Sequence, residues 1–422
     1  MDMITAVRGF KDILPQETGK WRYIEETARN IFSDFGFREI RVPILEKTAL
    51  FKRSIGELTD IVEKEMYTFL DRSDEYITLR PEATASIIRA YLEHSMYSAD
   101  PVAKLFTIGP MFRRERPQKG RYRQFHQINV ESIGLDDPRI DAEIILMLTQ
   151  YLERIKIADS ELQINSLGCT TCRPDYRKKL TLFLRGKEND LCEDCRRRIG
   201  SNPLRILDCK RKNCIHAIEN APNTLDFVCP GCDEHFKKLQ EFLNIFGIPF
   251  VINTRMVRGL DYYTKTTFEI VTESLGAQNA IAGGGRYDGL VRDLGGPDVP
   301  GTGFALGCER ILSLVPFKDD DFLLYPDLFI AAIGDDAEKL SFILCNRLRL
   351  RGVKVETDYA GKSLKSQMKK SDKLKCRFTL MLGKKELMEK VAVLRDMQSG
   401  MQEYLTIDDI EDTIVKKLQE RK

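Results

Sequence analysis

The densest positive charge in this chain of 422 residues lies between residues 112 and 127, which read FRRERPQKGRYRQFHQ. Six of the eleven residues from 113 to 123 are basic. Arginines on a rigid strand can hold phosphate through paired, charge-assisted hydrogen bonds. Pro117 and Gly120 indicate a turn, so the segment is predicted to form a strand, a loop and a second strand. A solvated charged hairpin has the same composition, and composition alone favours neither interpretation.

Two further segments combine glycine with polar side chains. Residues 256–263 place Arg258 close to Tyr262 and Tyr263, a set that could line a polar pocket, although buried tyrosines are more often part of a core. Residues 282–289 contain three consecutive glycines, without the spacing of a dinucleotide-binding or Walker loop. Such a run lets backbone approach a ligand closely, but in isolation a plain turn is the simpler interpretation.

Residues 301–310, GTGFALGCER, lead into the apolar run Ile311, Leu312 and Leu314. The pattern predicts a strand that enters a buried helix. Arg310 would be the charged residue on this helix and would need a partner, either a carboxylate of the protein or a bound phosphate.

Eight of the eleven cysteines lie between residues 165 and 236. They form three C-x-x-C pairs and a fourth, looser pair: Cys169 and Cys172, Cys192 and Cys195, Cys229 and Cys232, and Cys209 and Cys214. Two thiolates at the C-x-x-C spacing can bind one Zn²⁺. One four-thiolate site with spare cysteines, two such sites, or reduced and partly buried thiols all fit the spacing. A closed site of this kind is structural, so we expect no catalysis from it.

The elements that must position these residues follow from periodicity. Residues 18–36 have the apolar spacing of a helix, and residues 38–45 alternate as a strand does. Other strand-like runs are 104–109, 125–133, 266–272 and 277–282. Alternation without a regular βαβ rhythm predicts a mainly antiparallel sheet.

Beyond residue 325 the pattern changes to alternating strands and helices, which predicts a separate α/β domain after a polar linker at 316–321. Within this domain, residues 361–376 carry six lysines against one aspartate and could face RNA phosphate, or could be a solvated helix face. The segment 165–236 is basic and rich in cysteine, and has the composition of an insertion.

Global composition narrows the class of protein. The formal net charge is +2, so any basic surface must be local. The N-terminus has no secretory pattern and no run approaches the ~20 apolar residues that a membrane span needs. We therefore expect a cytoplasmic protein without a membrane partner.

In their order along the chain, these segments resemble the signature blocks of class II aminoacyl-tRNA synthetases, and the resemblance covers nearly the whole sequence. Residues 36–50, 112–127 and 301–314 resemble motifs 1, 2 and 3, of which motif 1 is the dimer-interface element. Residues 258–263 and 283–290 resemble two blocks specific to the histidine branch of the family, and residues 80–84 resemble its amino-acid-binding loop.

The resemblance implies an α+β catalytic domain with a mainly antiparallel sheet in residues 1–164 and 237–320. It also implies a mostly helical, cysteine-rich insertion domain in 165–236 and an α/β anticodon-binding domain in 325–422. The expected protein is a homodimer that joins L-histidine to tRNA(His) through a histidyl-adenylate. It would consume ATP with Mg²⁺ and release AMP and pyrophosphate.

The resemblance further implies roles for single residues. Arg258 and Arg113 would be catalytic, with Arg258 placed to neutralise the transition state where other class II enzymes use an additional metal ion. The residues expected to bind histidine are Glu82, Thr84, Arg113, Gln127, Glu131, Arg258, Tyr262 and Tyr263. Those expected to bind ATP are Arg113, Arg121 and Arg310, and those expected to approach the tRNA acceptor end are Arg116 and Gln118.

Two other functions are compatible with parts of the sequence. A regulatory paralogue of histidine biosynthesis would keep the fold without charging tRNA, but such paralogues usually lack the C-terminal domain and lose motif residues. A pure RNA-binding or scaffold protein would leave the set Arg113, Arg121, Arg258 and Arg310 unexplained. The active synthetase is therefore the favoured hypothesis.

Overall fold

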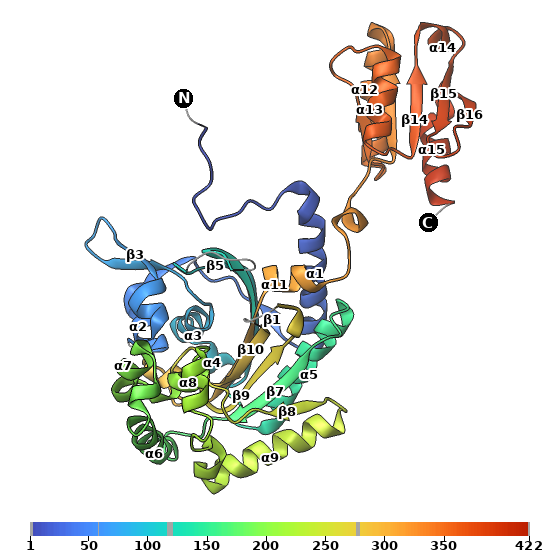
Figure 1. The fold of residues 1–422 in the computed structure, drawn as a ribbon. Coiled ribbons are helices and arrows are strands. Elements are labelled where there is room, and N and C mark those ends of the chain that lie inside the picture. The colour runs from blue at the N-terminus through green and yellow to red at the C-terminus, as the bar shows by residue number, and fades with distance from the viewer. Residues whose placement is uncertain (1–2, 58, 116–120, 276–278, 421–422) are drawn as a thin grey trace. The chain divides into compact units, whose positions relative to one another are not determined.

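The structure is a computed structural model that describes residues 3–57, 59–115, 121–275 and 279–420 (Figure 1). Contacts divide the chain into two compact units, Met1–Asp319 and Asp320–Lys422. Each unit has its own sheet and its own hydrophobic core. We describe the two units separately.

An eight-stranded sheet organises the first unit, in the order β1-β5-β6-β11-β10-β9-β7-β8. Its strands are β1 (Arg38–Glu39), β5 (Ala103–Phe112), β6 (Gln124–Ile133), β7 (Glu161–Ser166), β8 (Phe250–Ile252), β9 (Thr264–Val271), β10 (Ala280–Arg286) and β11 (Gly301–Gly307). All neighbouring strands between β5 and β7 pair antiparallel, and only the outer strands β1 and β8 join in parallel. The expected mainly antiparallel sheet is confirmed.

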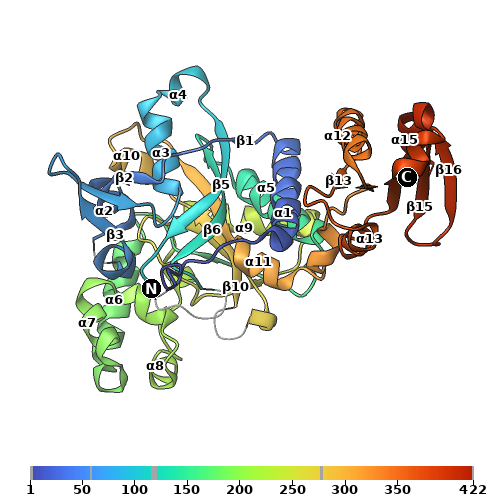
Figure 2. The ribbon, with the colours of Figure 1, turned by 90° about the horizontal axis from the view of Figure 1, so that it is seen from above.

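Three long helices cover one face of this sheet: α1 (Pro15–Asp34), α5 (Pro138–Arg154) and α9 (Pro230–Ile245). Figures 1 and 2 show them along one side, with α2 (Thr48–Ile55), α3 (Thr84–Glu93) and the helices of the insertion along the other. Apolar side chains of the three helices form one core with alternate residues of the strands, among them Ile128 and Val130 of β6 and Phe304 and Leu306 of β11. Because side chains of a strand alternate between faces, the residues between these are turned to the opposite face.

Smaller elements complete the first unit beside the polar face. A three-stranded sheet has the order β2-β4-β3, with β2 (Leu45–Lys47), β3 (Tyr67–Leu70) and β4 (Tyr76–Leu79). It is accompanied by α2 (Thr48–Ile55), the π-helix Ile61–Glu65, α3 (Thr84–Glu93) and α4 (Met96–Ala99). Later in the chain lie the 3-10 turn Glu273–Leu275 and α10 (Leu290–Asp293). Helix α11 (Cys308–Leu314) contributes to the core beneath α1, and the 3-10 turn Asp319–Phe322 lies where the first unit ends.

The segment 165–236 folds mainly into helices and helical turns. They are α6 (Arg173–Arg185), α7 (Glu193–Ser201), α8 (Lys212–Ala217) and the 3-10 segments Glu188–Asp190, Pro203–Asp208 and Thr224–Phe227. Its core combines Tyr176, Leu180 and Leu184 with four of the cysteines, and it also takes in Val257 and Tyr263 from the segment that precedes β9. The insertion therefore packs directly on one of the predicted site segments.

The second unit has a five-stranded sheet in the order β13-β12-β14-β15-β16. Its strands are β12 (Leu328–Ala332), β13 (Val355–Thr357), β14 (Phe378–Leu382), β15 (Val391–Asp396) and β16 (Gln402–Thr406). Its helices are α12 (Asp335–Leu350), α13 (Leu364–Lys373), α14 (Lys384–Met388) and α15 (Ile410–Gln419), and a 3-10 turn covers Ile407–Asp409. Strands β13, β12 and β14 are parallel, whereas β14, β15 and β16 are antiparallel. The expected α/β unit is confirmed, with an antiparallel extension.

Two predictions about local structure are wrong. The expected strand 38–45 is interrupted, because only Arg38 and Glu39 pair with β5 and β2 begins at Leu45. Between these strands, Arg80 Nη1 donates hydrogen bonds to the carbonyls of Val42 and Pro43, at 2.8 and 3.4 Å. These bonds replace those that a neighbouring strand would make. The glycine run is also not a turn, since it lies inside β10, between β9 and β11.

Among the described residues, no helix combines the length and the apolar character that crossing a membrane requires.

Candidate active site

A cavity of about 170 Å³ lies on the polar face of the large sheet. All eight residues predicted to bind histidine line it: Glu82, Thr84, Arg113, Gln127, Glu131, Arg258, Tyr262 and Tyr263. Strand β6 contributes lining residues because its side chains alternate between the two faces of the sheet. Gln127, Asn129 and Glu131 face the cavity, while Ile128 and Val130 face the core. The cavity walls combine two carboxyl groups and three tyrosines with Arg113 and Arg258, which suits a small ligand that carries both N–H groups and a carboxylate.

Glu131 is the buried acidic group of this cavity. Its carboxylate accepts hydrogen bonds from Thr84 Oγ1 and from the Tyr287 hydroxyl, each at 2.6 Å. Burial raises the pKa of Glu131 to about 8, although both hydrogen bonds oppose the shift. Gly303, opposite Glu131 in the sheet, leaves the room that this carboxylate occupies, since a Cβ there would lie 2.9 Å from its Cδ.

Glu82 is the second buried carboxylate of the cavity. It accepts hydrogen bonds from the backbone N–H groups of Thr84 and Ala85, at 2.7 and 3.0 Å, at the start of α3. Burial raises the pKa of Glu82 as well. Two buried carboxyl groups in one small cavity favour a ligand that brings its own N–H groups.

A second cavity, of about 180 Å³, adjoins the first and is lined by four arginines: Arg113, Arg121, Arg258 and Arg310. It contains all three residues predicted to bind ATP. Burial and the neighbouring Arg121 lower the pKa of Arg310, although it stays far above neutrality for a guanidinium. Glu115, which pairs with Arg121, and Glu309 line the same space, so four guanidinium groups lie against two carboxylates. The remaining positive charge favours an anion there, and the bidentate geometry of arginine suits phosphate.

Arg113 and Arg258 line both cavities, together with Gln127, Gly283 and Ala305. Arg113 follows β5 directly, donates from Nε to the carbonyl of Pro81 at 2.9 Å and lies over the ring of Phe125. Its guanidinium is therefore held between the two cavities by groups that are themselves fixed. A reaction between a ligand in one cavity and an anion in the other would take place beside these two arginines.

Arg258 is held by an ion pair with Glu269 of β9 and lies over the ring of Tyr263, with Cζ 5.5 Å from its centroid. Burial opposes the charge, but Glu269 raises the pKa of Arg258, so the guanidinium is charged at every relevant pH. Gly283 pairs with Glu269 across the sheet, and a Cβ at Gly283 would lie 2.6 Å from Arg258 Cζ. Gly283, the first glycine of the run, thus makes room for the arginine.

The family model for histidyl-tRNA synthetase matches residues 9–311, and a model described as an anticodon binding domain matches residues 327–417. The chain belongs to the histidyl-tRNA synthetase family. This confirms the resemblance on which the expected fold and site residues rest.

Relatives extend the similarity over the full length of this family member. A histidine–tRNA ligase of Geobacter sulfurreducens is 57% identical over 95% of this chain and 96% of the relative, and one of Syntrophotalea carbinolica is 52% identical over 98% and 99%. Among solved structures, the apo histidyl-tRNA synthetase of S. aureus is 36% identical, with a TM-score of 0.82 over 98% of this chain and all of that one. The histidyl-tRNA synthetase of Nostoc sp. PCC 7120, 20% identical with a TM-score of 0.68, shows the same fold.

Several residues of this synthetase-family site were not predicted individually. Tyr287 and Asn129 line the first cavity, and Glu269 holds Arg258. Glu269 and Asn129 lie in strands with the alternation of site-facing positions, which is a signal that the sequence carries. Arg116 and Gln118, predicted to approach the tRNA acceptor end, lie outside the described residues.

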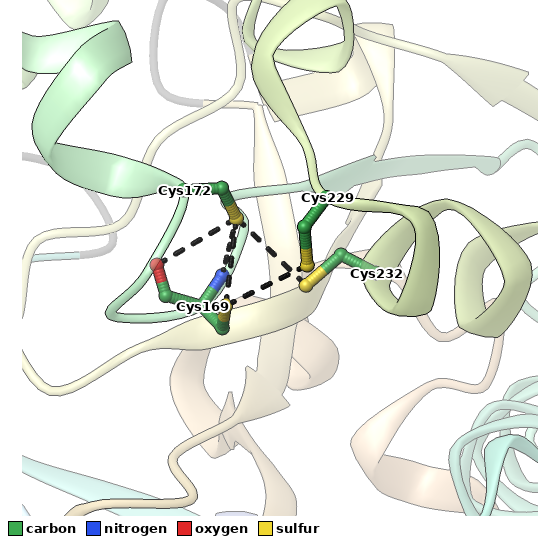
Figure 3. Close-up of side chains that lie close together, drawn as sticks. All are labelled: Cys169, Cys172, Cys229 and Cys232. Atoms are coloured by element: carbon green, nitrogen blue, oxygen red, sulfur yellow. Dashed lines mark hydrogen bonds between the residues drawn. The ribbon is translucent and has the colours of Figure 1, made fainter.

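The eight cysteines of the insertion form two separate groups of four, and in each group the sulfur atoms lie within 4.8 Å of one another. Cluster one consists of Cys169, Cys172, Cys229 and Cys232, and cluster two of Cys192, Cys195, Cys209 and Cys214. Figure 3 shows the four sulfurs of cluster one pointing toward one another from the turn before α6 and the start of α9. All eight are free thiols in the structure, and either group could hold a metal ion.

Proposed function

We propose that this chain joins L-histidine to tRNA(His) in two steps, forming a histidyl-adenylate from histidine and ATP and then transferring the histidyl group to the tRNA. One observation carries the proposal: an acidic, aromatic cavity and an arginine-lined cavity share Arg113 and Arg258 in their common wall. The two reactants of the first step are a carboxylate and a triphosphate. They repel one another, so fixed positive charge between them favours their approach.

In the first cavity, Glu82 and Thr84 take the α-amino group of histidine, with Gln127 nearby. Glu131, Tyr262 and Tyr263 surround the imidazole. A ring N–H donated to buried Glu131 rejects analogues that lack this group, because the acceptor positions that Thr84 and Tyr287 leave open on this carboxyl group would then stay unsatisfied.

In the second cavity, Arg113 holds the α-phosphate of ATP and the histidine carboxylate, while Arg121 and Arg310 hold the γ-phosphate end. The carboxylate attacks the α-phosphorus in line and pyrophosphate leaves. Arg258, which cannot lose its proton, stabilises the charge that develops on the α-phosphate in the transition state. Mg²⁺ that accompanies the triphosphate would find oxygen ligands in Glu115 and Glu309, which line this cavity.

We assign three domains to the chain: a catalytic domain in residues 1–164 and 237–320, an insertion domain in 165–236 and an anticodon-binding domain in 325–422. Arg116 and Gln118 approach the acceptor end. The match of residues 327–417 to an anticodon-binding model supports charging over the regulatory alternative. A solved structure titled as an ATP phosphoribosyltransferase regulatory subunit/histidyl-tRNA synthetase shares only the fold, at 19% identity and a TM-score of 0.64.

Zn²⁺ is the metal that best suits the cysteine clusters, and we assign one ion to each. Zn–S bonds of about 2.3 Å in a tetrahedron place sulfur atoms about 3.8 Å apart. In cluster one, Cys169 Sγ lies 3.6 Å from Cys172 Sγ and 3.8 Å from Cys229 Sγ, and Cys172 Sγ lies 3.9 Å from Cys232 Sγ. The ion would replace hydrophobic core that a segment of this size lacks.

We further assign a homodimeric state and a cytoplasmic location. The segment that resembles motif 1 lines a largely apolar cavity of about 930 Å³ with Ile40, Val42, Pro43 and Leu50. Ile44 and Leu45 beside it are exposed, and an exposed apolar surface of this kind suits a second copy of the chain. Light scattering that gives the mass of a single chain at micromolar concentration would contradict the dimer.

The activation step is tested by exchange of labelled pyrophosphate into ATP with each of the twenty amino acids. We expect exchange with histidine and Mg²⁺ alone. Exchange with a different amino acid, or none with histidine, would refute the assignment.

A further inference from the structure

Cluster one lies at the base of the insertion, where the chain leaves the large sheet and returns to it. Cys169 and Cys172 follow β7, whereas Cys229 caps α9 and Cys232 lies in its first turn, 60 residues later. The turn between β7 and α6 is tied to the beginning of β9, because Leu167 N donates to Lys265 O at 2.8 Å and Lys265 N donates to Gly168 O at 2.9 Å. An ion in cluster one would fix this turn against the sheet.

Arg173 connects the turn to the histidine cavity. It is the first residue of α6 and follows Cys172 directly, and its Nη2 donates a hydrogen bond to the backbone carbonyl of Tyr263. Its Nε is buried and has no hydrogen-bond partner among the described residues. A half-buried guanidinium that donates to one backbone carbonyl holds that carbonyl in place.

Tyr263 in turn shapes the cavity. The centroid of its ring lies 4.7 Å from that of the Tyr262 ring. Arg258 also lies over the Tyr263 ring, with Cζ 5.5 Å from the centroid. Both tyrosines and Arg258 line the cavity assigned to histidine. A shift of the Tyr263 backbone would therefore move the aromatic wall of that cavity.

Resting on the proposed histidine and zinc sites, we infer that Arg173 is a positioning residue through which the ion in cluster one holds Tyr263 in place for histidine binding. The ion fixes the turn 169–172, the turn orients Arg173, and Arg173 fixes the carbonyl of Tyr263. The walls of the ATP cavity come from β6, β10, β11, α11 and the segments after β5 and before β6, and Arg258, which lies over Tyr263, also lines it. Arg258 is assigned to the transition state and not to the binding of ATP. Histidine affinity should thus depend on the ion and ATP affinity should not.

Arg177 provides a matched control. It lies one turn further along α6 and also donates from Nη2 to a backbone carbonyl, that of Ser201, at 2.5 Å, within the insertion. An alternative role for Arg173 is to offset the negative charge of four thiolates around one Zn²⁺. In that case its loss would lower the metal content and leave the histidine affinity of the loaded protein unchanged.

The experiment is a thermodynamic cycle on the full-length protein, with metal removal on one side and substitution on the other. Histidine binding is measured by calorimetry, KM values for histidine and ATP by pyrophosphate exchange, and zinc by mass spectrometry. In the loaded protein, Arg173→Gln should weaken histidine binding about tenfold, as expected for a lost charged hydrogen bond, with KM for ATP unchanged. Arg173→Lys, which keeps a donor, should recover part of the loss, and Arg177→Gln should match the parent.

Chelation of the ion should weaken histidine binding in the parent and in Arg177→Gln, and should add little in Arg173→Gln. Equal effects of chelation in all three proteins, unchanged histidine binding in Arg173→Gln, or a parallel rise of both KM values would overturn the inference. If the zinc site or the histidine site itself were wrongly assigned, the parent protein would contain no zinc or would show no histidine-dependent exchange. These results can be told apart from a failure of the inference about Arg173.

Discussion

Gly283 lies directly beneath the guanidinium of Arg258, so close that a Cβ at this position would come within 2.6 Å of Arg258 Cζ. The two residues are 25 positions apart in the sequence and meet because Glu269, the ion-pair partner of Arg258, is opposite Gly283 in the sheet. The position of the proposed catalytic charge thus depends on the absence of a side chain.

Gly283→Ala should therefore displace the guanidinium of Arg258 and remove part of its contribution to catalysis. We expect a fall in the rate of adenylation on the order of 100-fold with little change in KM for ATP, since a charge used in the transition state appears in kcat. Arg258→Ala should lose at least as much, and the double variant should lose no more than Arg258→Ala. Gly200→Ala, where a Cβ meets nothing within 4 Å, is the control and should behave as the parent. Multiplicative losses in the double variant would contradict the connection.

The buried carboxyl of Glu131 predicts a pH-dependent stability. Burial raises its pKa from 4.5 to about 8, so its contribution to folding is fully present below about pH 4.5 and is lost as the pH rises through 8. Glu131→Gln cannot ionise, and its free energy of unfolding relative to the parent should increase between pH 4.5 and pH 8, by on the order of 1–3 kcal/mol. Urea unfolding at several pH values measures this difference.

Glu273→Gln, at an exposed position, serves as the control and should run parallel to the parent across this range. The prediction fails if Glu131→Gln also runs parallel. Glu131→Gln should in addition lose histidine-dependent exchange, because the amide, unlike the carboxyl group, cannot ionise when histidine binds and so cannot accept the ring N–H in a charge-assisted hydrogen bond.

Metal content follows from the two cysteine clusters. Protein purified without chelator should contain about two zinc ions per chain, one for each group of four thiolates. Cys169→Ser and Cys192→Ser should each release about one ion, and Cys308→Ala, in the core of the large sheet, should retain both. Eight readily titrated thiols and no bound metal would show that the clusters are reduced cysteines.

The lysines of α13 predict how the second unit contacts RNA. Lys370 pairs with Asp358 at 3.3 Å and lies over the ring of Phe329, whereas Lys365 and Lys369 are exposed. Changing Lys365 and Lys369 together to Gln should lower tRNA affinity and reduce its salt slope by about 1–2, with adenylation unchanged. The same change at Lys384 and Lys385 of α14 is the control. An unchanged slope would identify α13 as a solvated helix face.

The sequence predicts the strands of the large sheet well where side chains alternate cleanly. Runs 104–109 and 125–133 lie within β5 and β6. It fails between Val42 and Ile44, because the carbonyls there bind Arg80, a residue almost forty positions away. It also mistakes the glycines of β10 for a turn, since the reason for them is close packing in three dimensions: Gly283 leaves room for Arg258, and Gly284 and Gly285 lie against the neighbouring strands β11 and β9.

The residues that line the site could be predicted because their types and their order along the chain match the signature blocks of a known family. Partners that meet only in the folded chain, such as Arg258 with Glu269 or Glu131 with Tyr287, follow from the three-dimensional arrangement and not from spacing. The same is true of the cysteines. Spacing defines the C-x-x-C pairs, but only the fold brings the pair at 169 and 172 to the pair at 229 and 232.

The most direct test of the central claim is the charging of purified tRNA(His) with labelled histidine. With ATP and Mg²⁺, the parent protein should attach histidine to tRNA(His) and to no other tRNA, and Arg258→Ala should reduce the rate on the order of 100-fold or more. Absence of charging by a protein that binds histidine and ATP, or charging that does not depend on Arg258, would contradict the account.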